Sequence, residues 1–157
     1  MTSPLLKPLE RYYRHLAPWL DRLPLDAVLL LMRVVLGSVF FLSALTKVDA
    51  GGIMQSTFFL FENEYDLPVI PPALAAYLAT LAEISLSLAL WAGLGTRLAA
   101  TGLLCMTLVI QTFVYPGAWV THGLWAGCLL NLILRGPGIL SLDWLLNAWL
   151  TDSSRQR

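Results

Sequence analysis

Residues 26–48 read DAVLLLMRVVLGSVFFLSALTKV, an apolar run that is long enough to cross a lipid bilayer as a helix. Arg33 lies near its start, and Glu83 lies near the middle of a second such run, residues 72–95. An ionised side chain at membrane depth is costly unless it faces the interior of a helix bundle and finds a partner there. The sequence therefore predicts an integral membrane protein with a polar centre, and function is to be sought at that centre.

The composition of the chain indicates the same class. The 157 residues are 57% hydrophobic and 13% charged, with a mean hydropathy of +0.69. A soluble domain averages roughly 25% charged residues, so water is not the main solvent of these side chains. The length fits one compact unit, and no basic stripe indicates a nucleic-acid partner. The predicted partner of most of the surface is the lipid bilayer.

The predicted fold is an all-α bundle of four transmembrane helices with amphipathic interfacial helices at both ends. The third and fourth spans are short, and Pro116-Gly117 between them predicts a tight antiparallel hairpin. The predicted segments are an interfacial helix at 1–25, spans at 26–48 and 72–95 around an external loop with a short helix at 49–71, spans at 98–115 and 119–135, and an interfacial helix and tail at 138–157.

The placement of Lys and Arg predicts the orientation. Basic residues precede the first span, lie between the second and third, and follow the fourth, whereas the loop at 49–71 has no Lys or Arg. By the positive-inside rule both termini are expected in the cytoplasm. The loop acids Asp49, Glu62, Glu64 and Asp66 lack the spacing of a calcium loop, so we interpret them as solvated residues and predict no metal site.

Two helix faces carry the small and polar residues expected where helices pack on one another. The first face comprises Arg33, Gly37, Phe40, Ala44 and Lys47, and the second comprises Ala76, Thr80, Glu83 and Ser87. Arg33 and Glu83 differ in depth by somewhat under ~10 Å at the helical rise, so we expect them to pair. Two interpretations of that pair stay open, namely a buried ion pair that fixes helix register and a ligand or proton site.

Other candidate residues lie on the third and fourth spans. Gln111 and His122 join Arg33, Lys47 and Glu83 as candidates for binding a ligand or quinone, although His122 also suits a membrane interface. Cys105 and Cys128 each lie about eleven residues from the Pro116-Gly117 turn, which places them at nearly equal depth. They could form a redox pair, or they could serve as small packing residues.

A series of short motifs runs along the chain in a fixed order. It begins with RVVLGSVF at 33–40 and Lys47. It continues through Leu67-Pro68, Pro72-Ala73, Ala82-Glu83 and GLGTR at 93–97, and it ends with His122, Trp125-Ala126, GPG at 136–138 and SLD at 141–143. In these motifs the chain resembles the DoxX family of small bacterial membrane proteins. The resemblance implies a four-helix bundle in the bacterial cytoplasmic (inner) membrane. The family takes its name from a subunit associated with quinone-linked thiosulfate oxidation but is functionally broad, so the resemblance does not carry that enzyme activity over to this chain. A quinone is a possible cofactor, although the sequence requires none.

Three functions remain open at this point, because the sequence shows no haem-type histidine pair, metal-ligand cluster or nucleotide-binding loop that would indicate an independent enzyme. The first is a membrane subunit or accessory of a redox system that meets a quinone or another membrane or soluble subunit. The second is a scaffold or assembly factor without a ligand site. The third is a small-molecule transporter, for which one four-helix chain would need to form a homo-oligomer. We favour the first.

Overall fold

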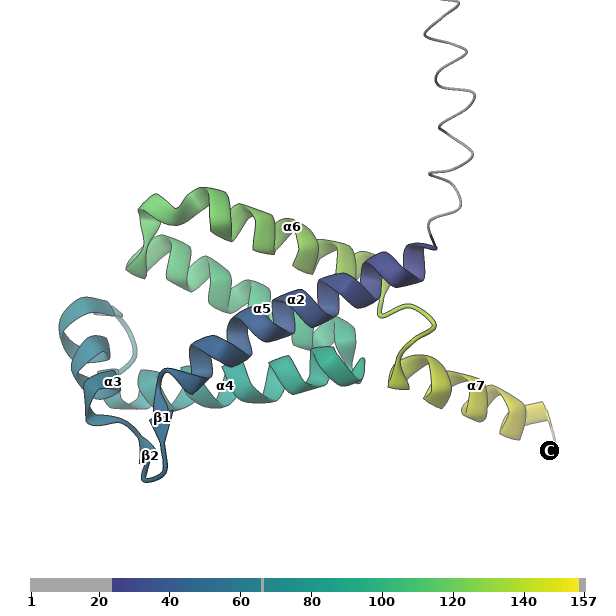
Figure 1. Cartoon of the computed structure of the whole chain (residues 1–157), viewed down its shortest axis with the longest axis horizontal. Helices are drawn as coiled ribbons and strands as arrows, with labels where there is room; N and C mark the ends of the chain where they lie inside the picture. Colours follow the sequence, from purple (N-terminus) through teal and green to yellow (C-terminus); the bar gives the residue numbers. More distant parts are fainter. Residues whose placement is uncertain (1–23, 66, 156–157) are drawn as a thin grey trace, which may run out of the picture.

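The computed structural model describes residues 24–65 and 67–155. Four of its helices are long and apolar enough to cross a membrane. They are α2 (Leu25–Leu45), α4 (Pro72–Ala92), α5 (Thr96–Val109) with its π-helical extension η2 (Ile110–Val114), and α6 (Trp119–Arg135). In the bundle α2 packs on α4, α4 on α5, α5 on α6, and α6 returns to α2 (Figure 1). The predicted all-α membrane fold is confirmed.

Two of the connections between these helices, the one from α2 to α4 and the one from α5 to α6, lie at one end of the bundle, which we call the loop side. The long connection contains a two-stranded antiparallel hairpin of β1 (Val48–Asp49) and β2 (Gly52–Ile53), then α3 (Gln55–Leu60) and a π-helical turn, η1 (Phe61–Tyr65). The short connection is the 3-10 turn η3 (Pro116–Ala118). The structure contains the short helix expected within 49–71, whereas the hairpin before it was not predicted.

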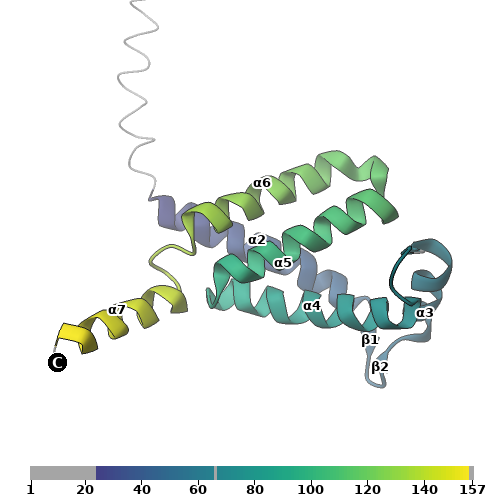
Figure 2. The same ribbon diagram turned by 180° about the vertical axis from the view of Figure 1, so that it is seen from behind.

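The opposite end, which we call the terminal side, carries the start of α2, the α4–α5 turn and the last helix, α7 (Leu142–Arg155). This helix extends away from the bundle (Figure 2). It exposes a set of large apolar side chains, as an interfacial helix would: Trp144, Leu145, Leu146, Trp149 and Leu150. The interfacial helix predicted at 1–25 lies almost entirely outside the described residues.

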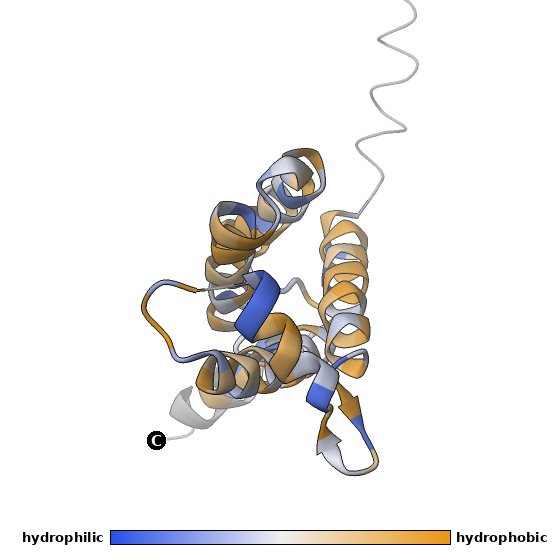
Figure 3. Cartoon of the chain, turned by 90° about the vertical axis from the view of Figure 1, so that its left-hand side faces the viewer, coloured by the Kyte–Doolittle hydropathy of each residue, from blue (hydrophilic) through white to orange (hydrophobic). Residues whose placement is uncertain are grey.

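The faces predicted to pack inward are the buried faces of the bundle. On α2 these include Arg33, Gly37, Phe40 and Ala44, and on α4 they include Ala76, Thr80, Glu83 and Ser87. The outward faces of the four long helices are mainly hydrophobic (Figure 3), as lipid contact requires. Gly37 brings α2 close to α4, because a Cβ atom there would lie 2.6 Å from the Trp91 ring.

Arg33 stabilises the terminal side by donating hydrogen bonds to backbone carbonyls. Nε donates to Leu90 O at 2.8 Å and Nη2 to Trp91 O at 2.9 Å, both in the last turn of α4. Nη1 donates to Pro137 O at 3.0 Å and Leu140 O at 2.7 Å, in the segment between α6 and α7. Carbonyls at a helix C-terminus lack helical partners and attract cations. Arg33 therefore joins the end of α4 to the approach to α7.

The prediction that Arg33 pairs with Glu83 is wrong. The guanidinium of Arg33 points to the terminal side, whereas Glu83 lies about 10 Å deeper than Leu90 at the helical rise and pairs with Lys47. The reason is geometric, since a long side chain can extend toward the nearer end of its helix, and five N–H donors match a group of carbonyls as well as they match a carboxylate.

Asp143 completes the terminal side. Its carboxylate accepts hydrogen bonds from Gly95 N at 2.7 Å and Thr96 N at 2.9 Å, where α5 begins, and its own N–H donates to Gly93 O at 2.9 Å. Gly93 has a φ of 66° and no room for a side chain, because a Cβ atom would lie 2.6 Å from Nη2 of Arg33. Arg33, Gly93 and Asp143 thus form a terminal clamp around the α4–α5 turn.

We predict that Arg33→Met lowers the free energy of unfolding in mild detergent by about 3 kcal/mol, because it leaves buried carbonyls unpaired. Unfolding followed by circular dichroism measures this loss. The loss should add to that of Glu83→Gln, since the two side chains share no partner. A coupling energy above about 1 kcal/mol in the double variant would show instead that Arg33 and Glu83 interact.

Candidate functional site

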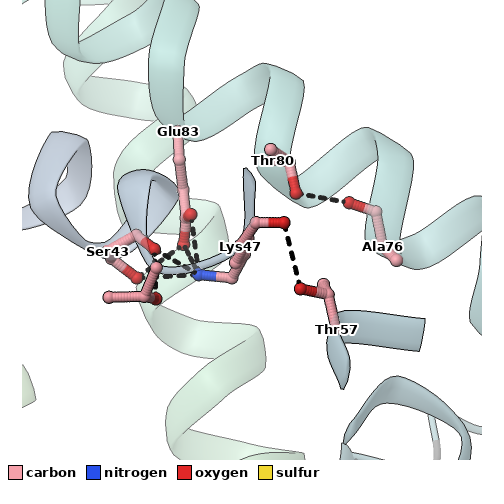
Figure 4. A network of polar contacts seen from close by, with 7 residues as sticks. Ser43, Lys47, Thr57, Ala76, Thr80 and Glu83 are labelled. Atoms are coloured by element: carbon pink, nitrogen blue, oxygen red, sulfur yellow. Dashed lines mark hydrogen bonds and ion pairs between the residues drawn. The ribbon is translucent and has the colours of Figure 1, made fainter. Parts of the chain in front are cut away.

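Lys47 and Glu83 form an ion pair inside the loop-side half of the bundle. Lys47 Nζ lies 2.8 Å from Glu83 Oε2 and 3.1 Å from Oε1 (Figure 4). Ser43 bridges the two, since its Oγ accepts from Nζ at 2.8 Å and donates to Oε1 at 3.1 Å. The side chains of Lys47 and Glu83 are only 12% and 4% exposed. Each charge at this depth is therefore compensated within the protein.

The local backbone explains why Lys47 takes this position. It lies just past the end of α2, where helix carbonyls favour a cation, and Nζ also donates to Ser43 O at 3.1 Å. The carbonyl of Lys47 accepts hydrogen bonds from Met54 N at 3.0 Å and from the Thr57 hydroxyl at 3.1 Å. The long connection is therefore fastened directly over the ion pair (Figure 4).

The ion pair retains unused capacity to accept hydrogen bonds. An ammonium has three N–H donors, and those of Lys47 are directed at Ser43 O, Ser43 Oγ and the Glu83 carboxylate. A carboxylate can accept about four hydrogen bonds, whereas Glu83 Oε1 accepts from Ser43 and Lys47, and Oε2 accepts from Lys47 alone. Glu83 can thus accept further hydrogen bonds, while the donors of Lys47 are all in use.

His122 on α6 is held in one tautomer by Gln111. Nε2 of Gln111 donates to the carbonyl of Pro116 at 2.7 Å, so the amide oxygen is the atom that lies 2.7 Å from His122 Nδ1. Because an amide oxygen only accepts, the Nδ1 atom of His122 carries the proton and Nε2 of the neutral ring is an acceptor. Among the residues that the structure describes, nothing donates a hydrogen bond to this Nε2.

A cavity of about 430 Å³ lies beside these groups on the loop side of the bundle. Its polar lining comes from Ser43, Lys47, Tyr65, Glu83, Tyr115 and His122, and its remaining walls are mostly apolar. Burial, together with a hydrogen bond to Tyr115, raises the pKa of the Tyr65 phenol above its ordinary value, so this hydroxyl stays protonated. The cavity is thus an apolar chamber with a small number of polar groups, as is typical of a small-molecule site.

Aromatic side chains form part of the wall. The Trp125 ring lies 5.5 Å from the Phe40 ring, in an edge-to-face arrangement, and 5.2 Å from the His122 ring, measured between centroids. All three residues line the cavity. Such contacts fix the orientation of flat side chains, so the wall offers a preformed surface to a flat ligand.

Two π-helical turns also line the cavity. Phe61 and Tyr65 belong to η1, and Ile110 and Val114 belong to η2. π-helical turns make up well under 1% of residues in proteins, and they occur frequently at functional sites. Each inserts an extra residue into a helical turn and so changes the direction of the side chains around it. Two of them meeting at one cavity indicate that this end of the bundle is shaped for a purpose other than close packing.

The structure brings together some of the predicted site residues and separates others. Lys47, Glu83, His122 and Cys105 line the cavity. Gln111 does not line the cavity but contacts His122, which does, and Arg33 lies at the terminal side. Cys128 packs against the bundle core, and both thiols are free, so the two cysteines do not form the disulfide that was the alternative to a packing role.

Sequence reasoning missed several lining residues. Ser43 could have been found, because it lies one helical turn before Lys47 on the same face. Tyr65 and Tyr115 lie in turns outside regular α-helix, where periodicity gives no signal.

In the acidic connection between α2 and α4, Asp49 Oδ1 accepts a hydrogen bond from Gly51 N at 2.8 Å and closes the hairpin turn. Within the described part of the chain, no group of three or more His, Cys, Asp or Glu side chains could hold a metal ion.

Comparison with known proteins identifies the family. No curated protein and no solved structure matches the chain. The family model of DoxX matches residues 28–116. The match covers more than half of the chain and includes Lys47, Glu83 and both π-helical turns, whereas His122 lies beyond it. This four-helix membrane protein therefore belongs to the DoxX family.

Proposed function

We propose that this chain is a membrane subunit of a redox system and that its cavity binds a quinone or its quinol. The observation that carries the proposal is an apolar cavity of about 430 Å³ with a buried, hydrogen-bonded polar end at Lys47 and Glu83. Small-molecule sites commonly have volumes of about 300–1,000 Å³ and combine apolar walls with few polar groups. A quinone has the matching form, a flat polar head on a hydrocarbon tail.

The hydrogen-bonding groups around Lys47, Glu83 and His122 favour the reduced form of such a ligand. A quinone carbonyl only accepts hydrogen bonds, whereas the two hydroxyls of a quinol also donate them. Glu83 Oε2 and His122 Nε2 are acceptors with unused capacity, and Lys47 has no N–H left to donate. A group left without its hydrogen bond in a buried site weakens binding. We therefore expect the quinol to bind more tightly than the quinone.

A partner subunit, either membrane-bound or soluble, would exchange electrons with the bound quinol. The Trp125 and Phe40 rings, which meet edge to face, would restrict the orientation of the head, and the Lys47–Glu83 pair would meet its hydroxyls. In this proposal the cellular location is the bacterial cytoplasmic membrane, with both termini in the cytoplasm and the cavity in the outer half of the bilayer.

The binding test uses protein in nanodiscs, with decylubiquinol and decylubiquinone as probes and empty nanodiscs as the blank. Wild-type protein should retain more of either probe than empty nanodiscs do, with a preference for the quinol. Glu83→Gln should weaken quinol binding by about tenfold or more, because it removes a charged acceptor. The affinity for the quinone should fall less, because the amide of Gln can donate a hydrogen bond to the quinone carbonyl. Retained probe is quantified by chromatography.

Glu62→Gln is the matched control, since Glu62 is an exposed acid of η1 that does not line the cavity. It should bind both probes as the wild type does. Unfolding curves of all variants separate lost binding from lost structure. If wild-type protein retains no more quinol than empty nanodiscs do, the chain is better interpreted as a scaffold in which Lys47 and Glu83 only hold α2 against α4.

The proposed orientation has its own test, which rests on the distribution of Lys and Arg. Reporter fusions after Gly52 and Gly117 should be active as external fusions. Fusions after Arg97 and Arg157 should be active as cytoplasmic ones. An external C-terminus would contradict the orientation, and with it the placement of the cavity in the outer half of the membrane.

A further inference from the structure

The cavity reaches the surface of the bundle between α4 and α5. Among its lining residues, three on α4 and α5 are also exposed on the outside of the bundle: Leu78 on α4, which is 51% exposed, Val109 on α5, which is 39% exposed, and Cys105 on α5. At the loop side, Ile70 and Tyr115 also line the cavity and are 39% and 49% exposed. A residue that both lines a cavity and faces outward marks an opening. The opening at Leu78, Val109 and Cys105 lies between two membrane-spanning helices and therefore faces lipid.

The position of the opening along the helices supports this. Leu78 is six residues from the start of α4, so it lies about 9 Å below the loop-side end of that helix, and Glu83 lies about 16 Å below it. Cys105 lies at a comparable depth, nine residues before the end of η2. These depths are inside the hydrocarbon of a bilayer whose core is about 30 Å thick. A molecule dissolved in the acyl chains could thus enter without crossing the headgroups.

The helices α4 and α5 touch at one point, and on the loop side of that point most of the α4 side chains that line the cavity are small. A Cβ atom on Gly102 would lie 2.7 Å from Cδ1 of Leu86, so α5 and α4 touch there. Nearer the loop side, the α4 lining residues beside Leu78 and Glu83 are alanines, namely Ala75, Ala79 and Ala82. The helices therefore meet below the cavity and are separated by short side chains beside it.

The route from water is partly covered. The long connection covers the loop side of the cavity with Phe61, which is buried, and with Tyr65 and Leu67, which are half-buried. Phe61 packs against Ala75 and Ala76 of α4. Moving this cover would expose apolar surface that is now packed, so entry from water is limited to the part of the loop side where Ile70 and Tyr115 are exposed.

The charge of the cavity restricts the class of ligand. Among the described residues that line it, Lys47 and Glu83 carry the formal charges, and they compensate each other. A phospholipid headgroup would bring its own charges to a site that has no unpaired partner for them, which is unfavourable at low dielectric. A neutral head with a hydrocarbon tail meets no such penalty.

We infer that a neutral, membrane-dissolved amphiphile enters the cavity sideways, through the opening lined by Leu78, Cys105 and Val109. Its head passes inward to Glu83, and its tail remains between α4 and α5 in contact with lipid. The inference rests on the proposed function, because it takes the quinone site as the destination. It adds the route and the requirement for a neutral head.

The test narrows the opening without touching the polar end. Leu78→Phe combined with Val109→Phe adds bulk at the opening. The matched control combines Leu81→Phe with Leu108→Phe, on the same two helices, at positions that are 66% and 55% exposed and do not line the cavity. Binding of decylubiquinone to protein in nanodiscs is followed by quenching of Trp125 fluorescence in a stopped-flow instrument. Trp125→Phe identifies the part of the signal that comes from the cavity.

Lateral entry predicts that the association and dissociation rates of the narrowed variant both fall by about tenfold, with their ratio unchanged and the control variant unaffected. Unchanged rates with intact quenching overturn lateral entry but leave the quinone site standing. A weaker affinity at an unchanged association rate also overturns it, because Leu78 and Val109 would then belong to the site. If wild-type protein shows no Trp125-dependent quenching, the proposed function itself fails. If the unfolding temperature of the double variant falls below that of the wild type, the same rates are measured on Leu78→Phe and Val109→Phe separately.

Discussion

An ionised group inside a membrane-spanning bundle must be satisfied by the protein itself, and the two ends of this molecule meet that requirement differently. At the terminal side, Arg33 is surrounded by four backbone carbonyls and Asp143 binds the start of α5. The hydrogen bonds of the Arg33 guanidinium and of the Asp143 carboxylate there all go to backbone groups. At the loop side, Lys47 and Glu83 satisfy each other beside a cavity, and acceptor capacity is left over. The charged groups at the terminal side therefore hold the backbone together, whereas the carboxylate at the loop side can still accept hydrogen bonds from a molecule in the cavity.

Helical periodicity predicted which faces of α2 and α4 are buried, but it did not predict which charges pair. Periodicity gives the direction in which a residue leaves its helix, and it places Arg33 and Lys47 on the same face of the predicted span 26–48. Both have long, flexible side chains, so either could be expected to reach Glu83. The choice depends on the carbonyls of Leu90, Trp91, Pro137 and Leu140, which the α4–α5 turn and the approach to α7 bring together. No local pattern in the sequence reveals that juxtaposition.

The cavity was beyond sequence reasoning for a related reason. It depends on η1 folding back over α4 and on the π-helical end of α5, and neither produces a regular hydrophobic period. The two cysteines illustrate the same limit, because their spacing from Pro116-Gly117 gave their depth but not their direction. Cys105 faces outward beside the cavity and Cys128 packs on the core. Depth follows from counting residues, whereas contact across helices depends on their rotation and tilt.

Joining two helices through the buried Lys47–Glu83 pair costs desolvation free energy for both charges. Replacing a buried ion pair with well-packed apolar residues is often neutral or stabilising, so such a pair is weak evidence of a purely structural role. The terminal clamp already fixes α2 against α4 with hydrogen bonds to backbone carbonyls, which leave no carboxylate in the bundle interior. A second, ionic fastening of the same two helices adds little to register. Its position beside a cavity of about 430 Å³, with a carboxylate still able to accept hydrogen bonds, gives the pair a reason to be ionic. Under the proposed function the pair serves the cavity first and the packing of α2 on α4 second.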